Sequence, residues 1–199
     1  QSSSTSPKGI RAYDEWQAWR AMNQRKALGF EGLDGEGPLA KQLERVLQSS
    51  GILQLAEKDD RPNANHAFTR CLEVRDAEKL SDTTARVTFR FPVLQEYLNM
   101  GGTLHGGQQA AFYDIATSCT LFLIRRPGFW HSAGTSRSLT VTYLRPAFVD
   151  ERLLMECHLV STGKRLCLMQ ASMKREKDGV LISTCEHTKY NVDADESRL

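Results

Sequence analysis

Hydrophobic and polar residues alternate along six segments that begin at about residue 67. Alternation with β-branched residues, bounded by Gly, Asp, Asn and Pro, is typical of β-strands that have one buried face. The six predicted strands are Ala67–Val74, Thr84–Phe91, Ser138–Tyr143, Arg152–Val160, Leu166–Met173 and Leu181–Tyr190. Residues 161–164 and 176–179 are typical of hairpin turns, so we expect the last three strands to form an antiparallel meander.

The segment 106–124, between the second and third predicted strands, has a different pattern. Its residues are apolar on nearly every face of a helix, which predicts a helix wholly enclosed by other structure. A buried helix wrapped by an antiparallel sheet is the simplest architecture for these elements. The sequence therefore predicts an α+β fold.

Two shorter amphipathic helices are predicted before the sheet, at Tyr13–Leu28 and Pro38–Leu47. We interpret Trp16 and Trp19 in the first helix as packing residues rather than ligand contacts. The predicted organisation is a flexible tail at 1–9, a helical extension at 10–60, one domain at 61–193 and a second tail at 194–199.

Composition narrows the class of protein. The chain has 26 basic and 24 acidic residues, a formal net charge of +2, so nothing indicates a nucleic-acid binder. No run approaches the roughly 18 apolar residues of a membrane span, so none is expected. Five cysteines, none in a CxxC spacing, are expected to be reduced thiols. We therefore expect the protein in the cytoplasm or the mitochondrial matrix, and the serine-rich start is compatible with the second.

One carboxylate stands out in the apolar helix. Between Phe91 and Ile124 there is no lysine or arginine, and Glu96 and Asp114 are the only formal charges. An unpaired carboxylate is costly to bury and is tolerated mostly where it does chemistry. A polar interface or a distant arginine would explain Asp114 equally well, so its role stays open on these grounds.

Four glycines surround the start of the same helix: Gly101, Gly102, Gly106 and Gly107. The first N–H groups of a helix have no partner within it, so they can bind an anion or a developing oxyanion. Glycine also lets a substrate approach this backbone closely. An N–H that polarises a carbonyl and a carboxylate that activates water are the two parts that acyl-transfer hydrolysis needs.

Three motifs in order carry a family resemblance: NMGGTLHGG at 99–107, Asp114, and SRSLTVTYLRPA at 136–147. Together they resemble the hotdog-fold acyl-CoA thioesterases, in the PaaI-type branch with an HGG loop and an aspartate on the central helix. The resemblance covers about residues 67–192. It implies a hotdog fold, a homodimer or homotetramer, and hydrolysis of an acyl-CoA in lipid metabolism without a cofactor.

The resemblance also implies roles for individual residues. The Gly106 N–H would hold the thioester carbonyl oxygen, and Asn99 would position the carbonyl or the attacking water. Asp114 would be the general base or nucleophile, with Ser136 orienting the water or the carboxylate. Because Gly106 and Asp114 lie about 12 Å apart along one helix, we expect each site to combine Gly106 of one copy with Asp114 of another, buried against that helix start.

Substrate-binding residues are predicted with less support. His105 and Gly107 belong to the loop before the helix, where His105 is expected to shape the loop or contact the substrate. Basic residues after the core motif are candidates for the CoA phosphates, although each could be a solvated surface charge: Arg137, Arg145, Lys164, Arg165 and Lys189. The other histidines form no metal-binding spacing, so no metal is expected.

Two alternatives remain. A non-catalytic hotdog module could bind acyl-CoA or a protein partner, but such a module has no need of a buried base. A dehydratase of acyl thioesters would need an active-site histidine paired with the acid, for which His105 is the candidate.

Overall fold

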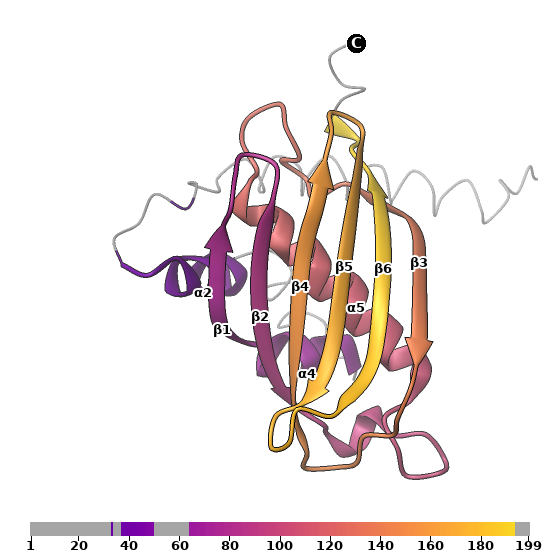
Figure 1. The fold of residues 1–199 in the computed structure, drawn as a ribbon. Helices are drawn as coiled ribbons and strands as arrows, with labels where there is room; N and C mark the ends of the chain where they lie inside the picture. The colour runs from indigo at the N-terminus through magenta and orange to yellow at the C-terminus, as the bar shows by residue number, and fades with distance from the viewer. Residues whose placement is uncertain (1–32, 34–36, 50–63, 194–199) are drawn as a thin grey trace, which may run out of the picture. The chain divides into compact units, whose positions relative to one another are not determined.

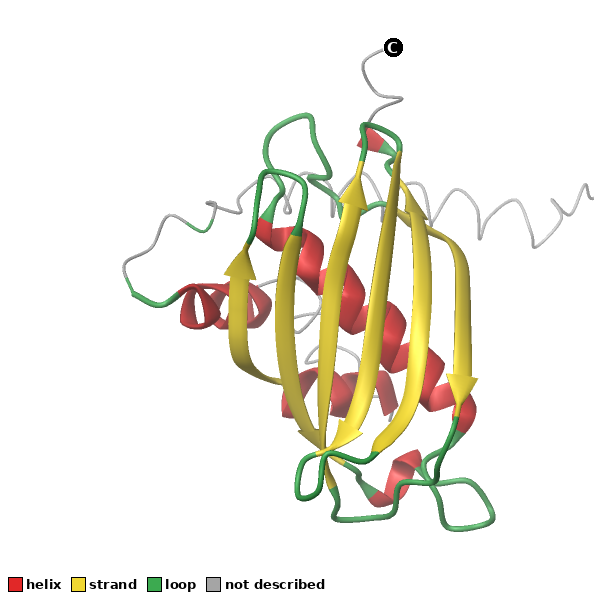
Figure 2. Cartoon of the chain, in the orientation of Figure 1, coloured by secondary structure: helices red, strands yellow, loops and turns green. Residues whose placement is uncertain are grey.

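The computed structural model describes residue 33 and residues 37–49 and 64–193, all within the second of two compact units, Gly32–Leu199. One antiparallel sheet has the strand order β1-β2-β4-β5-β6-β3, and helix α5 lies across one face of it (Figures 1 and 2). The strands are β1 (Glu73–Lys79), β2 (Ala85–Pro92), β3 (Thr135–Tyr143), β4 (Arg152–Thr162), β5 (Leu166–Arg175) and β6 (Leu181–Tyr190). The helices are α2 (Leu39–Ser49), α4 (Ala64–Cys71) and α5 (Gly106–Thr120), with short 3-10 turns at Gln95–Tyr97 and Leu121–Leu123. The predicted α+β fold and meander are confirmed.

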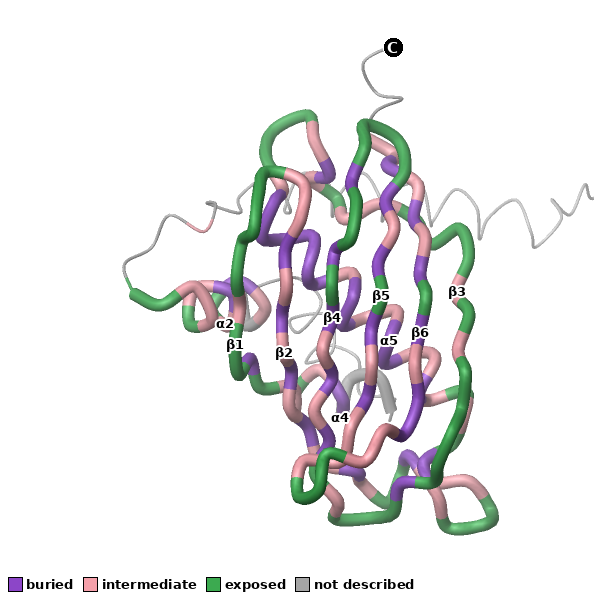
Figure 3. Tube along the Cα trace, in the orientation of Figure 1, coloured by how far each residue is buried: buried purple, intermediate pink, exposed green. Residues whose placement is uncertain are grey.

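The hydrophobic core lies between the inner face of the sheet and α5. Every second residue of β2, β4 and β5 is buried, so purple and paler positions alternate along these strands (Figure 3). Phe89, Leu153, Met155 and Met169 are among the residues with no more than trace exposure. The period of two read from the sequence therefore identified the buried face of the central strands correctly.

The prediction of a strand at Ala67–Val74 is wrong. Residues Ala64–Cys71 form helix α4, and the first strand begins only at Glu73. The helix places Phe68 against α5, where its ring stacks on Phe112 at 3.9 Å between centroids. Strand β1 was missed because it is an edge strand with mostly exposed, charged residues, which protect an edge against further pairing.

One N-terminal helix of the two predicted is described. The segment Pro38–Leu47 corresponds to α2, whose Leu43 and Val46 are buried. The predicted helix Tyr13–Leu28 and both predicted tails lie outside the described residues.

The central helix is less enclosed than its composition indicates. It ends at Thr120, and Leu121–Leu123 continue as a 3-10 turn. Asp114 keeps 46% of its side chain exposed, and Ala111, Ile115 and Ser118 are partly exposed. Complete enclosure is therefore wrong for the described chain, because the sheet covers only one side of α5.

A β-bulge in β3 turns one serine toward the helix. Ser136 pairs with Lys189 and Ser138 pairs with Thr188, so Arg137 is an extra residue in the ladder. Regular alternation from Leu139 would place Arg137, not Ser136, on the inner face. Bulges often re-aim a side chain beside an active site, and here the bulge brings Ser136 onto the face that α5 covers.

No helix among the described residues is long and apolar enough to cross a membrane. The five cysteines are free thiols, and all but Cys71 are buried. Burial raises the pKa of Cys119 to about 12, so this thiol stays protonated and packs as a small apolar side chain.

Candidate active site

The start of α5 is shaped by His105, which is its N-cap residue. The His105 Nδ1 accepts a hydrogen bond from the Gly107 N–H at 2.9 Å, and its backbone N–H donates to the Tyr97 carbonyl at 2.8 Å. The Gly107 N–H is therefore already used. Within the described part of the chain, no group accepts from the Gly106 N–H, so this donor is available to a ligand.

The loop before the helix is held by Asn99. Its Oδ1 accepts from the Gly101 N–H at 2.9 Å and from the Thr103 N–H at 3.2 Å. Its Nδ2 donates to Thr103 Oγ1 at 2.9 Å. An amide group has two N–H hydrogens, so Asn99 builds the loop and keeps one hydrogen for a further acceptor.

Tyr143, at the end of β3, lies against the start of α5. Its hydroxyl donates to the Gly106 carbonyl at 2.9 Å. A Cβ atom at Gly106 would lie 3.3 Å from Tyr143 Cζ. Tyr143 was predicted only as part of the motif 136–147, and the structure shows that it holds the Gly106–Gly107 peptide, next to the Gly106 N–H.

The Asp114 carboxylate has partners from two strands of its own chain. Ser136 Oγ donates to Asp114 Oδ1 at 2.6 Å. His187 Nε2 lies 3.4 Å from the same oxygen. Asp114 and Ser136 are therefore together as expected, while Asp114 itself remains half-exposed rather than buried against other groups of the described chain.

His187 is fully buried beneath this pair. Its Nε2 lies 3.0 Å from Ser136 Oγ, and its Nδ1 lies 2.7 Å from Thr117 Oγ1. Burial, assisted by the positive charge of Lys189, lowers the pKa of His187 to about 4 against the opposing effect of Asp114. The imidazole is therefore neutral at neutral pH.

These contacts differ from a Ser-His-Asp triad. In such a triad the two ring nitrogens face different partners, one the serine and the other the aspartate. Here the same nitrogen, Nε2, faces both Ser136 and Asp114. His187 is also too deeply buried to meet a substrate, whereas solvent reaches both Asp114 and Ser136.

His187 was not among the predicted site residues, because apart from His105 the histidines were compared only with metal-ligand spacings. The sequence pattern that could have identified it is the polar inner face of β6, whose inward residues are Ser183, Cys185, His187 and Lys189. The neighbouring strands carry mostly apolar residues at the equivalent positions. Polar residues of α5 meet them in three pairs: Tyr113 with Ser183, Thr117 with His187, and Ser118 with Lys189.

The basic residues proposed for CoA phosphates fall into two groups. Lys189 is only 5% exposed, and its Nζ donates to Ser118 Oγ at 2.6 Å; its assignment to the surface is wrong because β6 points it inward. Arg145 is exposed and donates to the Leu181 carbonyl at 3.1 Å, beyond the end of β3 that is opposite to Ser136. Arg137, Lys164 and Arg165 are also exposed. They share one end of the sheet, since Ser136 pairs with Lys189 and Asn191 binds the backbone of the 164–165 turn.

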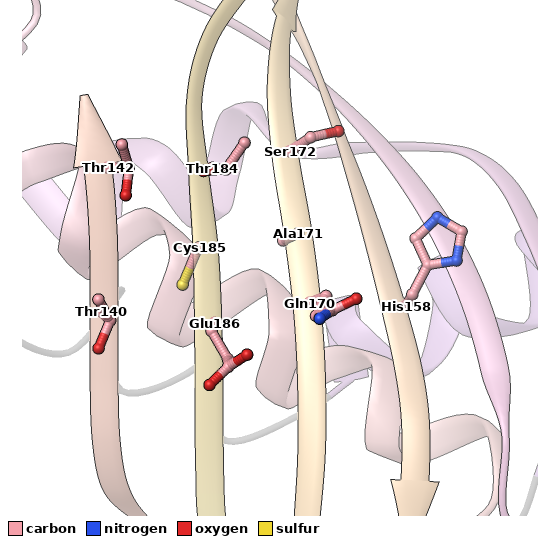
Figure 4. A pocket seen from close by; sticks show the side chains of 9 residues that line it. All are labelled: Thr140, Thr142, His158, Gln170, Ala171, Ser172, Thr184, Cys185 and Glu186. Atoms are coloured by element: carbon pink, nitrogen blue, oxygen red, sulfur yellow. The ribbon is translucent and has the colours of Figure 1, made fainter. Parts of the chain in front are cut away.

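Other features of the described chain are separate from this cluster. No group of three metal-binding side chains lies close together among the described residues. A shallow pocket on the sheet is lined by exposed side chains such as His158, Gln170 and Glu186 (Figure 4). These side chains alternate with the inward ones, so the pocket opens on the face opposite α5.

Comparisons with known proteins agree with this fold. The Thioesterase superfamily profile matches residues 101–182. Acyl-coenzyme A thioesterase 13 of Mus musculus is 28% identical over 123 residues, which are 62% of this chain and 84% of that protein. The human protein of the same name is 29% identical over 111 residues, 56% of this chain and 76% of that protein.

Solved structures give the same result for the fold. Zebrafish thioesterase superfamily member 2 has a TM-score of 0.59 at 21% identity, with 76% of this chain and 96% of that chain covered. Its mouse counterpart has a TM-score of 0.58 at 19% identity, with 78% and 98% covered. Together these comparisons confirm the hotdog fold and the resemblance to hotdog acyl-CoA thioesterases.

Proposed function

We propose that this hotdog protein of the thioesterase superfamily hydrolyses an acyl-CoA to the free acid and CoA. The observation that carries the proposal is the half-exposed Asp114 carboxylate, which accepts a 2.6 Å hydrogen bond from Ser136. A carboxylate that solvent reaches on one side and that is oriented on the other is suited to activate water. The relatives named acyl-coenzyme A thioesterase 13 support a thioester as the substrate.

In this proposal the Gly106 N–H polarises the thioester carbonyl. It is an unused donor at the positive end of α5, and the next peptide, Gly106–Gly107, is held by Tyr143 and His105. The remaining Asn99 N–H adds a second donor in the same loop. Preorganised donors of this kind stabilise the oxyanion that forms as water attacks.

The proposed site is shared between two copies of the chain. Gly106 and Asp114 lie in one straight helix, about 12 Å apart along its axis, and cannot both reach one carbonyl carbon. Strand β3 is an edge strand with exposed residues, so a second copy can pair there. In the resulting two-fold dimer, Gly106 of each copy would face Asp114 of the other.

The CoA phosphates are assigned to the exposed cations Arg137, Lys164 and Arg165. They gather at the end of the sheet that carries Ser136, and three cations in one region match the charges of the nucleotide part of CoA. His105 is assigned to orienting the substrate through its exposed ring. Because its Nδ1 accepts from Gly107, the neutral ring carries its proton on Nε2 and can donate it.

A dehydratase is not favoured. His187 is the histidine paired with Asp114, but it is fully buried and cannot reach a substrate. In the shared site, His105 of one copy would lie near Asp114 of the other. Because its Nδ1 accepts from the Gly107 N–H, however, the neutral ring carries its proton on Nε2 and has no free lone pair to take a proton from the acyl chain.

Release of free thiol from short, long and aromatic acyl-CoAs tests the proposal. We expect hydrolysis of at least one class without added metal, with the preferred acyl group identified by kcat/KM. The corresponding acyl-pantetheines are the control, because loss of the nucleotide should raise KM if Arg137, Lys164 and Arg165 hold the phosphates. Binding of CoA esters without any thiol release would instead favour the non-catalytic module.

Gly106→Ala is expected to lower kcat about ten- to a hundredfold, below the ~10²–10³ that loss of an oxyanion donor costs. The added Cβ would lie 3.3 Å from Tyr143 Cζ, so the tyrosine and the helix start must move apart. Gly163→Ala is the matched control, since its Cβ would meet only the Leu166 carbonyl at an ordinary 3.5 Å.

Mixing subunits tests whether the site is shared. Co-refolded in equal amounts, Gly106→Ala and Asp114→Asn should give about a quarter of native activity, because half of the molecules are mixed dimers with one intact site each. No activity above that of the unmixed variants would mean that Gly106 and Asp114 of the same copy form each site, which would contradict the shared site.

A further inference from the structure

The hydrogen bonds beneath Asp114 can be assigned proton by proton. The Thr117 hydroxyl lies 2.6 Å from the Tyr113 carbonyl and 2.7 Å from His187 Nδ1. A carbonyl cannot donate, so the single hydroxyl proton of Thr117 goes to Tyr113, and the proton of the second contact must come from the imidazole. The neutral His187 ring therefore carries its proton on Nδ1, and Nε2 has a free lone pair.

The same reasoning applies on the other side of the ring. An ionised carboxylate cannot donate either, so Ser136 gives its only proton to Asp114 across 2.6 Å. His187 Nε2 then lies 3.0 Å from Ser136 Oγ and 3.4 Å from Asp114 Oδ1 with no proton in between. In the cluster of Asp114, Ser136 and His187, the contact between Ser136 Oγ and His187 Nε2 therefore lacks the one proton that would make it a hydrogen bond.

One added proton completes the cluster in either of two positions. A proton on Asp114 lets the carboxyl donate to Ser136 and lets Ser136 donate to His187 Nε2. A proton on Nε2 lets the imidazolium donate to Ser136 while Ser136 keeps its bond to Asp114. The two arrangements interconvert by a shift of two protons along existing contacts, with no movement of heavy atoms.

We propose that Asp114, Ser136 and His187 act as one proton-accepting unit, in which His187 is a positioning residue that acts through Ser136. This inference rests on the proposed function with Asp114 as a general base. The proton that Asp114 takes from the attacking water passes to Ser136, whose own proton moves to His187 Nε2. Asp114 is thereby a carboxylate again while the intermediate lasts.

The proton balance of the reaction closes. The water oxygen forms a bond to the acyl carbon, and one water proton enters the cluster. The carbon–sulfur bond breaks with its electron pair on sulfur, and the thiolate or bulk water takes the proton back from the cluster. His187 returns to its neutral form with the proton on Nδ1.

The charges around the ring are suited to a transient proton. The charged groups that act on His187 are Asp114 of α5, which favours the imidazolium, and Lys189 of β6, which opposes it. Strand β3 contributes the uncharged Ser136 and Leu139, and β5 contributes Met169 opposite His187. Burial, assisted by Lys189, thus keeps the ring neutral at rest, and the negative charge of Asp114 favours its transient protonation.

His187→Gln tests the inference, because glutamine keeps polar groups near Thr117 and Ser136 but accepts no proton. We expect kcat to fall about ten- to a hundredfold with unchanged KM, less than the ~10²–10⁴ of a direct general acid or base, because His187 acts through Ser136. The acid limb of the kcat/KM profile should move to lower pH, because the unit has lost one of its two acceptors. In mixtures of H2O and D2O, kcat of the native protein should depend on the D2O fraction along a curve, because more than one proton moves. In His187→Gln this dependence should be linear.

His158→Gln is the matched control, because His158 also lies on a strand but is exposed on the opposite face of the sheet. We expect it to leave kcat, the pH profile and the isotope dependence unchanged. A His187→Gln protein that melts at a lower temperature but keeps the native kcat and curved isotope dependence would show that His187 is only structural.

Nitrogen NMR of the native protein tests the inference without turnover. At neutral pH, His187, assigned by its loss in His187→Gln, should carry its proton on Nδ1. Protonation of Nε2 on acidification should require a lower pH in Asp114→Asn, since the carboxylate favours the charged ring. A proton on Nε2 at neutral pH, or a titration unaffected by Asp114→Asn, would overturn the proton-sharing unit even if no acyl-CoA is hydrolysed.

Discussion

Asp114→Asn is expected to lower kcat for acyl-CoA hydrolysis about 10²–10⁴-fold, the usual contribution of a general base. Asparagine has the size of aspartate and can still accept from Ser136, which lies 2.6 Å from Oδ1 in the native protein. It has no negative charge and takes no proton from water. The loss corresponds to about 3–5 kcal/mol of transition-state stabilisation, at about 1.4 kcal/mol for each factor of ten.

Steady-state thiol release with saturating acyl-CoA measures this effect. Asp76→Asn is the matched control, because that carboxylate is 62% exposed on β1 and outside the cluster. Circular dichroism and oligomer size should be unchanged in both variants, since Asp114 contributes little to the core. Activity of Asp114→Asn within about threefold of native would remove Asp114 from the proposed chemistry.

A single turnover in labelled water separates the two possible roles of Asp114. If the carboxylate activates water, the label enters the product acid directly. If it attacks the thioester, an anhydride forms and the thiolate leaves; water attack at the Asp114 carbonyl carbon then leaves an Asp114 oxygen in the acid and puts the label in the protein. The proton-sharing unit needs the first result.

Phe112→Ala is expected to lower the free energy of unfolding by about 3–5 kcal/mol, the usual cost of removing a buried phenylalanine ring. Phe112 is fully buried and stacks on Phe68 at 3.9 Å between centroids. The rings of Phe91 and Tyr97 contact it edge-on at 5.6 and 4.9 Å. Its removal leaves a cavity where α4, α5 and β2 meet.

Urea unfolding at one fixed protein concentration measures this loss, because an oligomer's apparent stability depends on concentration. Phe148→Ala is the matched control, since 46% of Phe148 is exposed and surface changes usually cost no more than about 0.5 kcal/mol. A loss below about 1 kcal/mol for Phe112→Ala would mean that the aromatic cluster does not hold α4 on the domain.

Phe112 and Asp114 lie two positions apart on α5, but Phe112 is expected to contribute to stability and Asp114 to catalysis. Phe112 is buried against α4 and β2, and Asp114 is half-exposed beside β3 and β6. Stability and chemistry are therefore placed on opposite sides of one helix. Asp114→Asn can therefore lose activity without unfolding, so a loss of kcat in this variant can be attributed to the chemistry.

The sequence by itself determined the sheet, the central helix and the candidates for chemistry. Alternation with a period of two depends only on which side chains are buried, so it located the strands from Ala85 onwards to within a few residues. The glycine-rich turn and Asp114 could be identified from composition alone, because four glycines gather at one helix start and one carboxylate lies in an otherwise apolar helix. These signals are contained in short segments and survive without knowledge of the fold.

Tertiary structure decided how the candidates meet. Regular alternation along β3 would place Ser136 on the outer face, and the extra residue Arg137 in the ladder with β6 turns it toward Asp114. His187 joins the cluster from 51 residues beyond Ser136, through the pairing of β3 with β6. The residues Ala67–Cys71 became a helix because Phe68 stacks on Phe112. Register, bulges and helix docking depend on contacts between distant segments, which a local pattern cannot contain.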